Sequence, residues 1–168
     1  MISFAEVLAS TRRSAAHLEM RDAYMADDPA FVAWQDGQHI DPRQWWPDWL
    51  DLVRQTVARG VDMRRARIVS EPISDYIHYE YDVTDGNVES GEQVRWLPRR
   101  RATDLALPGN DYWIFDDRLV MVNHFAGNGQ KSEPGYELIE DDQVVRLCAS
   151  AFEAVWVRAV PHHEYKPV

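Results

Sequence analysis

The sequence predicts an α/β fold in which helices flank a mixed β-sheet. Three observations support this prediction: a length of 168 residues, a composition with 45% hydrophobic and 27% charged residues, and the alternation of helical and strand periodicity along the chain. The sequence contains no repeat and no Gly/Ser-rich linker. We therefore expect one domain over residues 1–168, with residues 1–45 as an N-terminal extension that packs on an α/β core of residues 46–160.

The first part of the chain predicts three helices and one strand. Residues 4–8 have the helical spacing of apolar side chains, whereas residues 16–20 alternate between apolar and polar, which is typical of a half-buried strand. Residues 28–37 predict a short helix, because an Asp-Pro pair opens the segment and a Gly closes it. Residues 46–57 predict the clearest helix, with Gly60 as its stop signal. Its apolar face consists of Trp46, Trp49, Leu50, Val53 and Val57.

Two strands with a helix between them follow. Residues 64–69 and 93–97 predict strands. Residues 74–86 fit either period, and we predict a helix because a Ser begins the segment as an N-cap and an Asp-Gly pair ends it. Such a helix suits the crossover between two parallel strands. Its inner stripe would consist of Tyr76, Tyr79, Glu80 and Val83.

The last part of the chain predicts a hairpin, a loop and a helix. Residues 112–115 and 119–124 are separated by little more than Asp116 and Asp117, so they predict a β-hairpin. Residues 125–134 contain Gly-Asn-Gly and predict a loop. An Asp at position 141 or 142 caps the final helix, which ends before Pro161. Its apolar stripe consists of Val144, Val145, Cys148, Phe152, Val155, Trp156 and Ala159.

Charge and cysteine content narrow the classes of protein. A net charge of −10 opposes binding to nucleic acid and to anionic membranes. The single cysteine cannot form an intramolecular disulfide, and it falls on the apolar stripe, so we expect a buried thiol. No charge-free window is long enough for a transmembrane helix, and the N-terminal residues lack the order of a signal peptide. We expect a cytoplasmic protein without a membrane anchor.

A basic segment interrupts this acidic chain. Residues 93–101 hold four arginines and no acid, so we expect them to contact an anion or a partner protein; the alternative is pairing with surface carboxylates. Contact of Trp96 and these arginines with RNA is a third interpretation, which the net charge opposes. The candidate binding residues are Ser70, Arg95, Trp96, Arg99, Arg100, Arg101 and Trp113.

Histidines and carboxylates raise two further hypotheses. His17-x-Glu19 and His78-x-Glu80 have a common spacing that is no specific metal signal, and His163 follows His162 in an expected solvated tail. We therefore expect no metal and no cofactor. If the protein is an enzyme, His124 is the candidate acid or base, together with Glu71, Asp75 or Asp116.

Long segments of the chain resemble a family. The strings SEPISDYIHYEYDVTDGNVESGEQVRWLPRR, LALPGNDYWIFDDRLVMVNHFAG and SAFEAVWVRAVPHHEY are similar to an actinobacterial family of uncharacterised domains. Members resemble accessory proteins found beside helix-turn-helix regulators and small partner proteins. This resemblance implies a regulatory role or a role in a toxin–antitoxin-like system.

The order of elements also resembles half of a phospholipase D-like domain, a fold that serves as a ligand-sensing domain in some regulators. The catalytic version carries His-x-Lys-x-x-x-x-Asp, whereas Phe125 and Ala126 follow His124 here. We therefore expect a non-catalytic cytoplasmic regulatory or accessory module that binds a small ligand or a partner protein. The alternative is a small enzyme of specialised metabolism, or one that acts on a phosphorylated substrate.

Overall fold

A seven-stranded mixed sheet forms the centre of the molecule in the computed structural model, which describes residues 2–168. The strand order is β6-β5-β4-β1-β2-β3-β7. The strands are β1 (Ser14–Glu19), β2 (Asp62–Val69), β3 (Gln93–Pro98), β4 (Tyr112–Phe115), β5 (Leu119–Phe125), β6 (Lys131–Ile139) and β7 (Val160–Pro161). The helices are α1 (Phe4–Ser10), α2 (Pro29–Gln35), α3 (Pro42–Trp45), α4 (Pro47–Ala58), α5 (Asp75–Glu89), α6 (Asp142–Trp156) and the 3-10 turn η1 (Arg99–Arg101).

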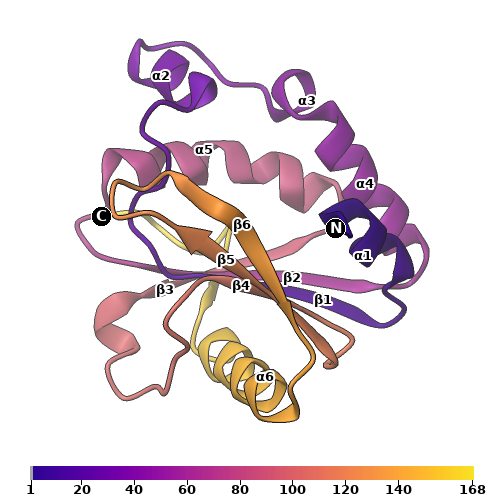
Figure 1. Cartoon of the computed structure of the whole chain (residues 1–168). Coiled ribbons are helices and arrows are strands. Elements are labelled where there is room, and N and C mark those ends of the chain that lie inside the picture. The colour runs from indigo at the N-terminus through magenta and orange to yellow at the C-terminus, as the bar shows by residue number, and fades with distance from the viewer. Residues whose placement is uncertain (1) are drawn as a thin grey trace.

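The helices cover both faces of the sheet (Figure 1). α6 lies on one face, where its stripe, including Cys148 and Trp156, packs against strand residues such as Leu18 and Ile68. α1 to α5 lie on the other face, where Val53 of α4 is in one cluster with strand residues. The predicted α/β fold with a mixed sheet is therefore confirmed. No helix within residues 2–168 is both long enough and apolar enough to cross a membrane.

β1, β2 and β3 run parallel, because α4 and α5 connect them as crossovers. β4, β5 and β6 are antiparallel, and the predicted hairpin is confirmed: Asp116 and Asp117 have φ angles of 53° and 51°, as a tight turn of the hairpin type requires. All four strands predicted from residue 64 onward belong to this one sheet.

The position of β1 corrects two predictions. β1 lies in the middle of the sheet, between β4 and β2, so this segment of the predicted extension 1–45 belongs to the α/β core. Five of its six residues are buried, so it is not half-buried as residues 16–20 predict. The alternation of apolar and polar residues in β1 instead reflects two buried faces of different character. Leu18 packs on the α6 side, whereas His17 and Glu19 are buried polar residues that line a cavity on the other side.

α5 is a helix, as predicted, but its end differs from the prediction. Ser74 caps it, and it continues through Gly86 to Glu89, where Gly91 follows with a φ of 102°. Gly86 serves packing: a Cβ atom there would lie 2.5 Å from the Cβ of Pro42. α3, which the sequence did not predict, approaches α5 at this glycine.

The final strands correct two further predictions. Residues 131–134 belong to β6, so the predicted loop 125–134 contracts to a turn between β5 and β6. β6 is an edge strand, where Pro134 needs no partner for a missing N–H group. His162 lies just after β7, which pairs with β3, and it is 4% exposed, so the expected solvated tail is wrong at this position.

Candidate functional site

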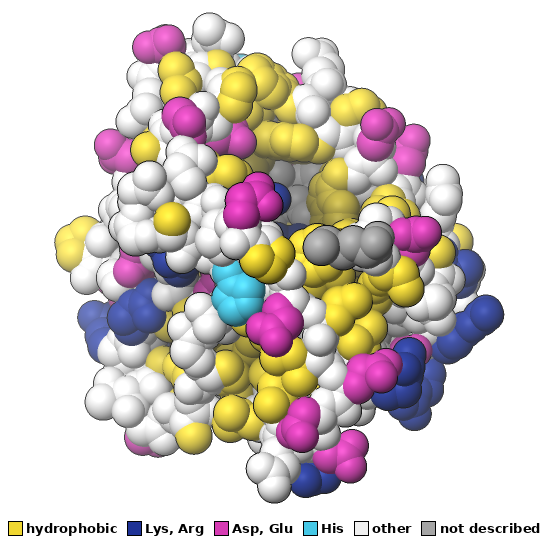
Figure 2. Space-filling model, in the orientation of Figure 1, with side chains coloured by type: hydrophobic (Ala, Val, Ile, Leu, Met, Phe, Trp, Pro, Cys, Tyr) yellow, Lys and Arg dark blue, Asp and Glu magenta, His cyan; other side chains and the backbone are white. Residues whose placement is uncertain are grey.

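A cavity of about 560 Å³ lies between the sheet and the α1–α5 layer. β1, β2, β4 and β5 supply its floor, α4 and α5 face them, and residues of β6 stand at its side. In Figure 2 a hollow surrounded by hydrophobic side chains is visible between the helices and β6. We call this space the central cavity.

Aromatic side chains form a large part of its wall. They contact one another: the ring centroids of Phe4 and Trp113 are 5.1 Å apart, and those of Tyr24 and Phe125 are 5.2 Å apart. The wall residues are Phe4, Tyr24, Trp46, Trp49, Tyr76, Tyr79, Trp113, Phe125 and Tyr136. Flat, rigid side chains of this kind offer a large apolar contact area at a low entropic cost.

Two arginines of β2 stand under this wall. Arg65 donates to Glu19 at 2.6 Å and to Glu92 at 2.8 Å, and Arg67 donates to Glu19 and to Thr84. Burial alone would raise the pKa of Glu19, but the guanidinium groups of Arg67 and Arg65 outweigh it and hold that pKa well below its usual range. This buried network fixes the floor in one arrangement.

His17 is the neutral member of the floor. Its ring stacks on Trp113 with centroids 4.3 Å apart, and its Nε2 lies 3.4 Å from the Asn123 amide nitrogen. Nδ1 lies 3.3 Å from a Glu19 oxygen but makes no hydrogen bond. Burial lowers the pKa of His17 to about 3, so the ring is uncharged at neutral pH.

Glu80 and Asp111 are the two carboxyl groups of the cavity whose pKa values are raised. One oxygen of Glu80 makes no hydrogen bond and lies 3.5 Å from the Arg67 Nε, and burial raises the pKa of this group. Asp111 accepts from the Met20 backbone N–H at 2.8 Å and from the Tyr24 hydroxyl. Burial raises the pKa of Asp111 to about 6. Both groups can therefore change protonation near neutral pH.

The predicted binding residues divide between the interior and the surface. Trp113 lines the central cavity. Trp96 is 0% exposed and donates to His162, so it is not available for the RNA or partner contact that the sequence suggested. Arg95 is half-buried, lies over the Trp156 ring at 4.2 Å and donates to the Trp156 carbonyl, so its guanidinium group is already engaged within the fold.

The remaining basic residues lie at the carboxyl ends of β2 and β3. Arg99 donates to the Ser70 hydroxyl at 3.0 Å and to the Met20 carbonyl at 2.6 Å, so it joins the loops that follow β1 and β2. Arg100 is exposed and lies 3.2 Å from Glu71, and Arg101 is exposed beside it. Arg100 and Arg101 are therefore the arginines of η1 that are most accessible to a partner, because Arg99 is partly buried and hydrogen-bonded to several groups.

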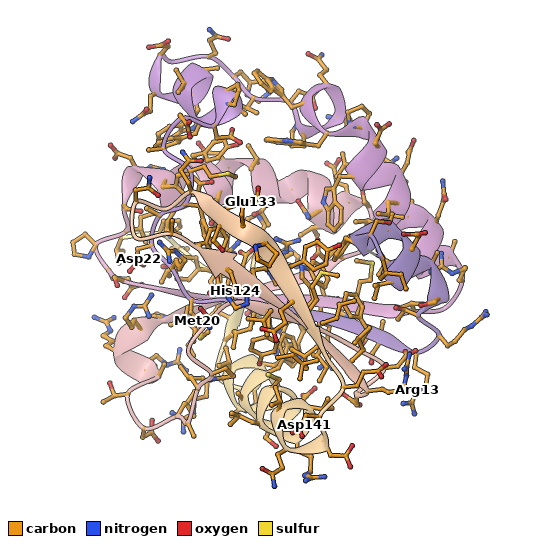
Figure 3. The ribbon with its side chains drawn as sticks, in the orientation of Figure 1. Arg13, Met20, Asp22, His124, Glu133 and Asp141 are labelled. Carbon is orange, nitrogen blue, oxygen red and sulfur yellow. The ribbon has the colours of Figure 1, made fainter. Side chains whose placement is uncertain are left out.

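The structure does not bring together the predicted acid/base set. Asp116 accepts from backbone N–H groups, including that of Arg13 at 2.7 Å, Glu71 accepts from the Tyr165 hydroxyl, and Asp75 is exposed at the start of α5. His124 lies on β5, 3.3 Å from Glu137. Arg13, which donates to Asp116, lies at the other end of the sheet from His124 (Figure 3). None of the four lines the central cavity. Within residues 2–168, no three His, Cys, Asp or Glu side chains are grouped as metal ligands.

Sequence reasoning missed most of the polar floor. A usable signal was present: Glu80 interrupts the apolar stripe of α5, and Arg65 and Arg67 alternate with the apolar residues Ala66 and Ile68 along a strand. Charged residues at the inward positions of buried elements indicate a network or a site.

Comparison with known proteins defines first the fold and then the family. The structure is similar to that of Nuc, a phospholipase D family member from Salmonella typhimurium, with a TM-score of 0.52, 11% sequence identity and coverage of 94% of this chain and 86% of that one. The fold is therefore phospholipase D-like. The chain belongs to the family described as a domain of unknown function (DUF6879), whose model matches residues 3–167.

Two further comparisons add no function. TrmBL2, described as an archaeal chromatin protein with a novel mode of DNA binding, shares 18% identity over 93% of this chain and 48% of that one, at a TM-score of 0.47. No curated protein matches the sequence.

Proposed function

We propose that the protein is a non-catalytic module that binds a small organic molecule in the central cavity and has a regulatory or accessory role in the cytoplasm. One observation carries this proposal: a cavity of about 560 Å³ combines an aromatic wall with a few buried ionisable side chains. Sites for small molecules have volumes of roughly 300–1,000 Å³ and this same mixture of apolar wall and few polar groups.

Unsatisfied polar atoms at the cavity support the proposal independently of its volume. His17 Nδ1 and one Glu80 oxygen are buried and make no hydrogen bond. Buried polar groups are normally satisfied, because an unsatisfied one costs about 1–3 kcal/mol. A bound molecule with a polar group would satisfy such atoms and recover that cost.

A cavity-filling variant tests the proposal. Val83→Phe adds a ring to a residue that lines the cavity, and Val157→Phe is the matched control at a side chain that is 74% exposed. We expect fragments from a thermal-shift panel to stabilise wild type and Val157→Phe but not Val83→Phe. Equal stabilisation of all three proteins by every active fragment would contradict binding in the cavity.

A small enzyme is the second candidate, and one observation favours it. Glu80 and Asp111 face the same cavity with pKa values raised toward neutrality, as general acids and bases require. These residues replace His124 in that role. If the protein is an enzyme, Glu80→Gln should abolish turnover of the molecule that it binds, whereas unchanged turnover would exclude Glu80.

A further inference from the structure

We propose that the central cavity selects an organic cation, a molecule with a flat apolar body and a protonated amine that pairs with Glu80 and Asp111. This inference rests on the proposed function of the cavity as a ligand site and adds the chemical class of the ligand. Three features of the described residues carry it: the surplus of carboxyl groups, the prior commitment of both buried arginines, and the aromatic wall.

Carboxyl groups outnumber cationic groups at the cavity. The acids that line it or lie directly beneath it are Glu19, Asp28, Glu80, Glu92 and Asp111, whereas the cations are the buried Arg65 and Arg67, the exposed Lys131, and Arg21, which lies over the Tyr24 ring near Asp111. His17 is neutral at physiological pH because of its burial. The site therefore carries a negative surplus when its acids are ionised, and such a surplus in a buried space favours a positive ligand.

The surplus resides in two residues. Glu19 is held by both arginines, and Glu92 by Arg65 and the Asn87 amide. Asp28 accepts from the first N–H groups of α2 as its N-cap. Glu80 and Asp111 remain. Glu80 has only a 3.5 Å approach to an arginine that Glu19 already engages. Asp111 accepts hydrogen bonds from neutral donors, and Arg21 faces it but donates to the Ala23 carbonyl instead.

The buried Arg65 and Arg67 are already paired with carboxylates of the protein, and this pairing disfavours an anionic ligand. Besides their carboxylate partners, Arg65 lies 5.5 Å from the ring centroid of Trp113 and Arg67 lies 4.9 Å from that of Trp96. An anion that enters would have to displace Glu19 or Glu92 from a buried ion pair, and separating such a pair is costly. A cation meets carboxyl groups that lack a strong partner.

The aromatic wall favours the same class of ligand. Tyr24, Tyr76 and Tyr79 line the cavity with the two carboxyl groups: Tyr24 donates to Asp111, Tyr76 lies one turn before Glu80 on α5, and Tyr79 directly precedes Glu80. The faces of such rings attract a cation, and the attraction grows when water is excluded. The remaining rings supply contact area for a flat body.

Three probes of one shape and different charge test the inference by isothermal titration calorimetry. The probes are tryptamine, which is cationic, 3-ethylindole, which is neutral, and indole-3-propionate, which is anionic. We expect tryptamine to bind at least about tenfold more tightly than either of the others. Glu80→Gln and Asp111→Asn should each remove most of that preference, while Glu89→Gln, an exposed acid at the end of α5, should leave it unchanged.

The outcomes separate this inference from the proposal on which it rests. Binding of the neutral or anionic indole as tightly as tryptamine would overturn the cationic preference and leave the cavity as a ligand site. A preference for tryptamine that survives both carboxamide variants would overturn the assigned residues. Failure of all three probes at about millimolar concentration would contradict both, because even a poorly matched aromatic fragment should bind an open apolar cavity in that range. The wild-type comparison does not depend on any variant that fails to fold.

Discussion

Arg67 shows at the scale of one residue why the floor of the cavity is fixed. Its side chain is 8% exposed and bonds to Glu19 and Thr84 on two different elements. A buried ion pair is no guarantee of net stability, but removal of one partner leaves the other charge buried without compensation. The network therefore specifies the arrangement of β1, β2 and α5 at the cavity.

Arg67→Ala should lower the free energy of unfolding by about 3–5 kcal/mol, because it removes one of the two cations that hold the buried carboxylate of Glu19 and leaves Thr84 without its donor. Arg118→Ala is the control, since Arg118 makes an exposed pair with Glu140 at 3.1 Å. Such pairs contribute roughly 0–1 kcal/mol. Urea denaturation of both variants measures the difference. If Arg67→Ala and Arg118→Ala lowered the free energy of unfolding by the same small amount, the buried network around Glu19 would contribute no more than an exposed ion pair.

Asp111 should make stability depend on pH. Its pKa rises from 3.8 in the unfolded chain to about 6 in the fold, so its stabilising contribution is complete below pH 3.8 and is lost as the pH rises through 6. The groups that face it are Tyr24, Glu19, Arg21 and the Met20 N–H group. The stability of wild type relative to Asp111→Asn should fall between pH 4 and 7 by at most about 3 kcal/mol.

Asp117→Asn, an exposed turn residue with positive φ that Asn tolerates, is the control for this profile. Denaturation at several pH values measures both variants. A constant difference between wild type and Asp111→Asn across this range would show that Asp111 titrates normally.

At the scale of elements, the sequence predicted those whose signals are local. α2, α4 and α6 begin and end at caps or at apolar periodicity, and the β4–β5 hairpin follows from its short turn at Asp116 and Asp117. β6 was missed because an edge strand with Pro134 and Gly135 has no alternating pattern. The end of α5 was misplaced because Gly86 is required by the approach of Pro42, which no local signal reveals.

α6 should depend strongly on Trp156. This side chain is 7% exposed, stacks on Phe152 and supports Arg95. Trp156→Ala should lower the free energy of unfolding by about 3–5 kcal/mol, because it leaves a cavity in the core. Val157→Ala, at a neighbouring exposed side chain, should change it by less than about 0.5 kcal/mol. Urea denaturation measures both variants. If the denaturation midpoint of Trp156→Ala equalled that of Val157→Ala, the described packing of α6 on the sheet would be contradicted.

The three arginines of η1 should behave differently from one another. The sequence predicted that Arg99, Arg100 and Arg101 all contact an anion or a partner, but Arg99 bonds to the Ser70 hydroxyl and to two backbone carbonyls. Arg99→Ala should therefore cost about 1–3 kcal/mol of stability.

The double variant Arg100→Ala, Arg101→Ala should change stability little and should weaken any partner contact of this turn, which a pull-down measures. If the double variant and wild type retained the same partner proteins in the pull-down, a partner contact through Arg100 and Arg101 would be excluded.

At the scale of the whole molecule, the central cavity depends on contacts that are distant in the sequence. Residues from Phe4 to Tyr136 meet there, and they become neighbours only because β1 enters the middle of the sheet. The sequence predicted the sheet and several of its strands, and it singled out Trp113 as a binding residue. It could not predict that His17, Glu19, Glu80 and Asp111 converge, because their proximity depends on the strand order.

Methyl NMR of methionine tests most directly whether a small molecule occupies this cavity. Met25 and Met121 line it, whereas Met20 packs on the α6 side of the sheet. When the tightest-binding fragment is titrated into the protein, we predict saturable shifts of the Met25 and Met121 ε-methyl signals and a smaller or absent shift for Met20. Saturable shifts of Met20 alone, with the other two signals unmoved at full occupancy, would contradict the account.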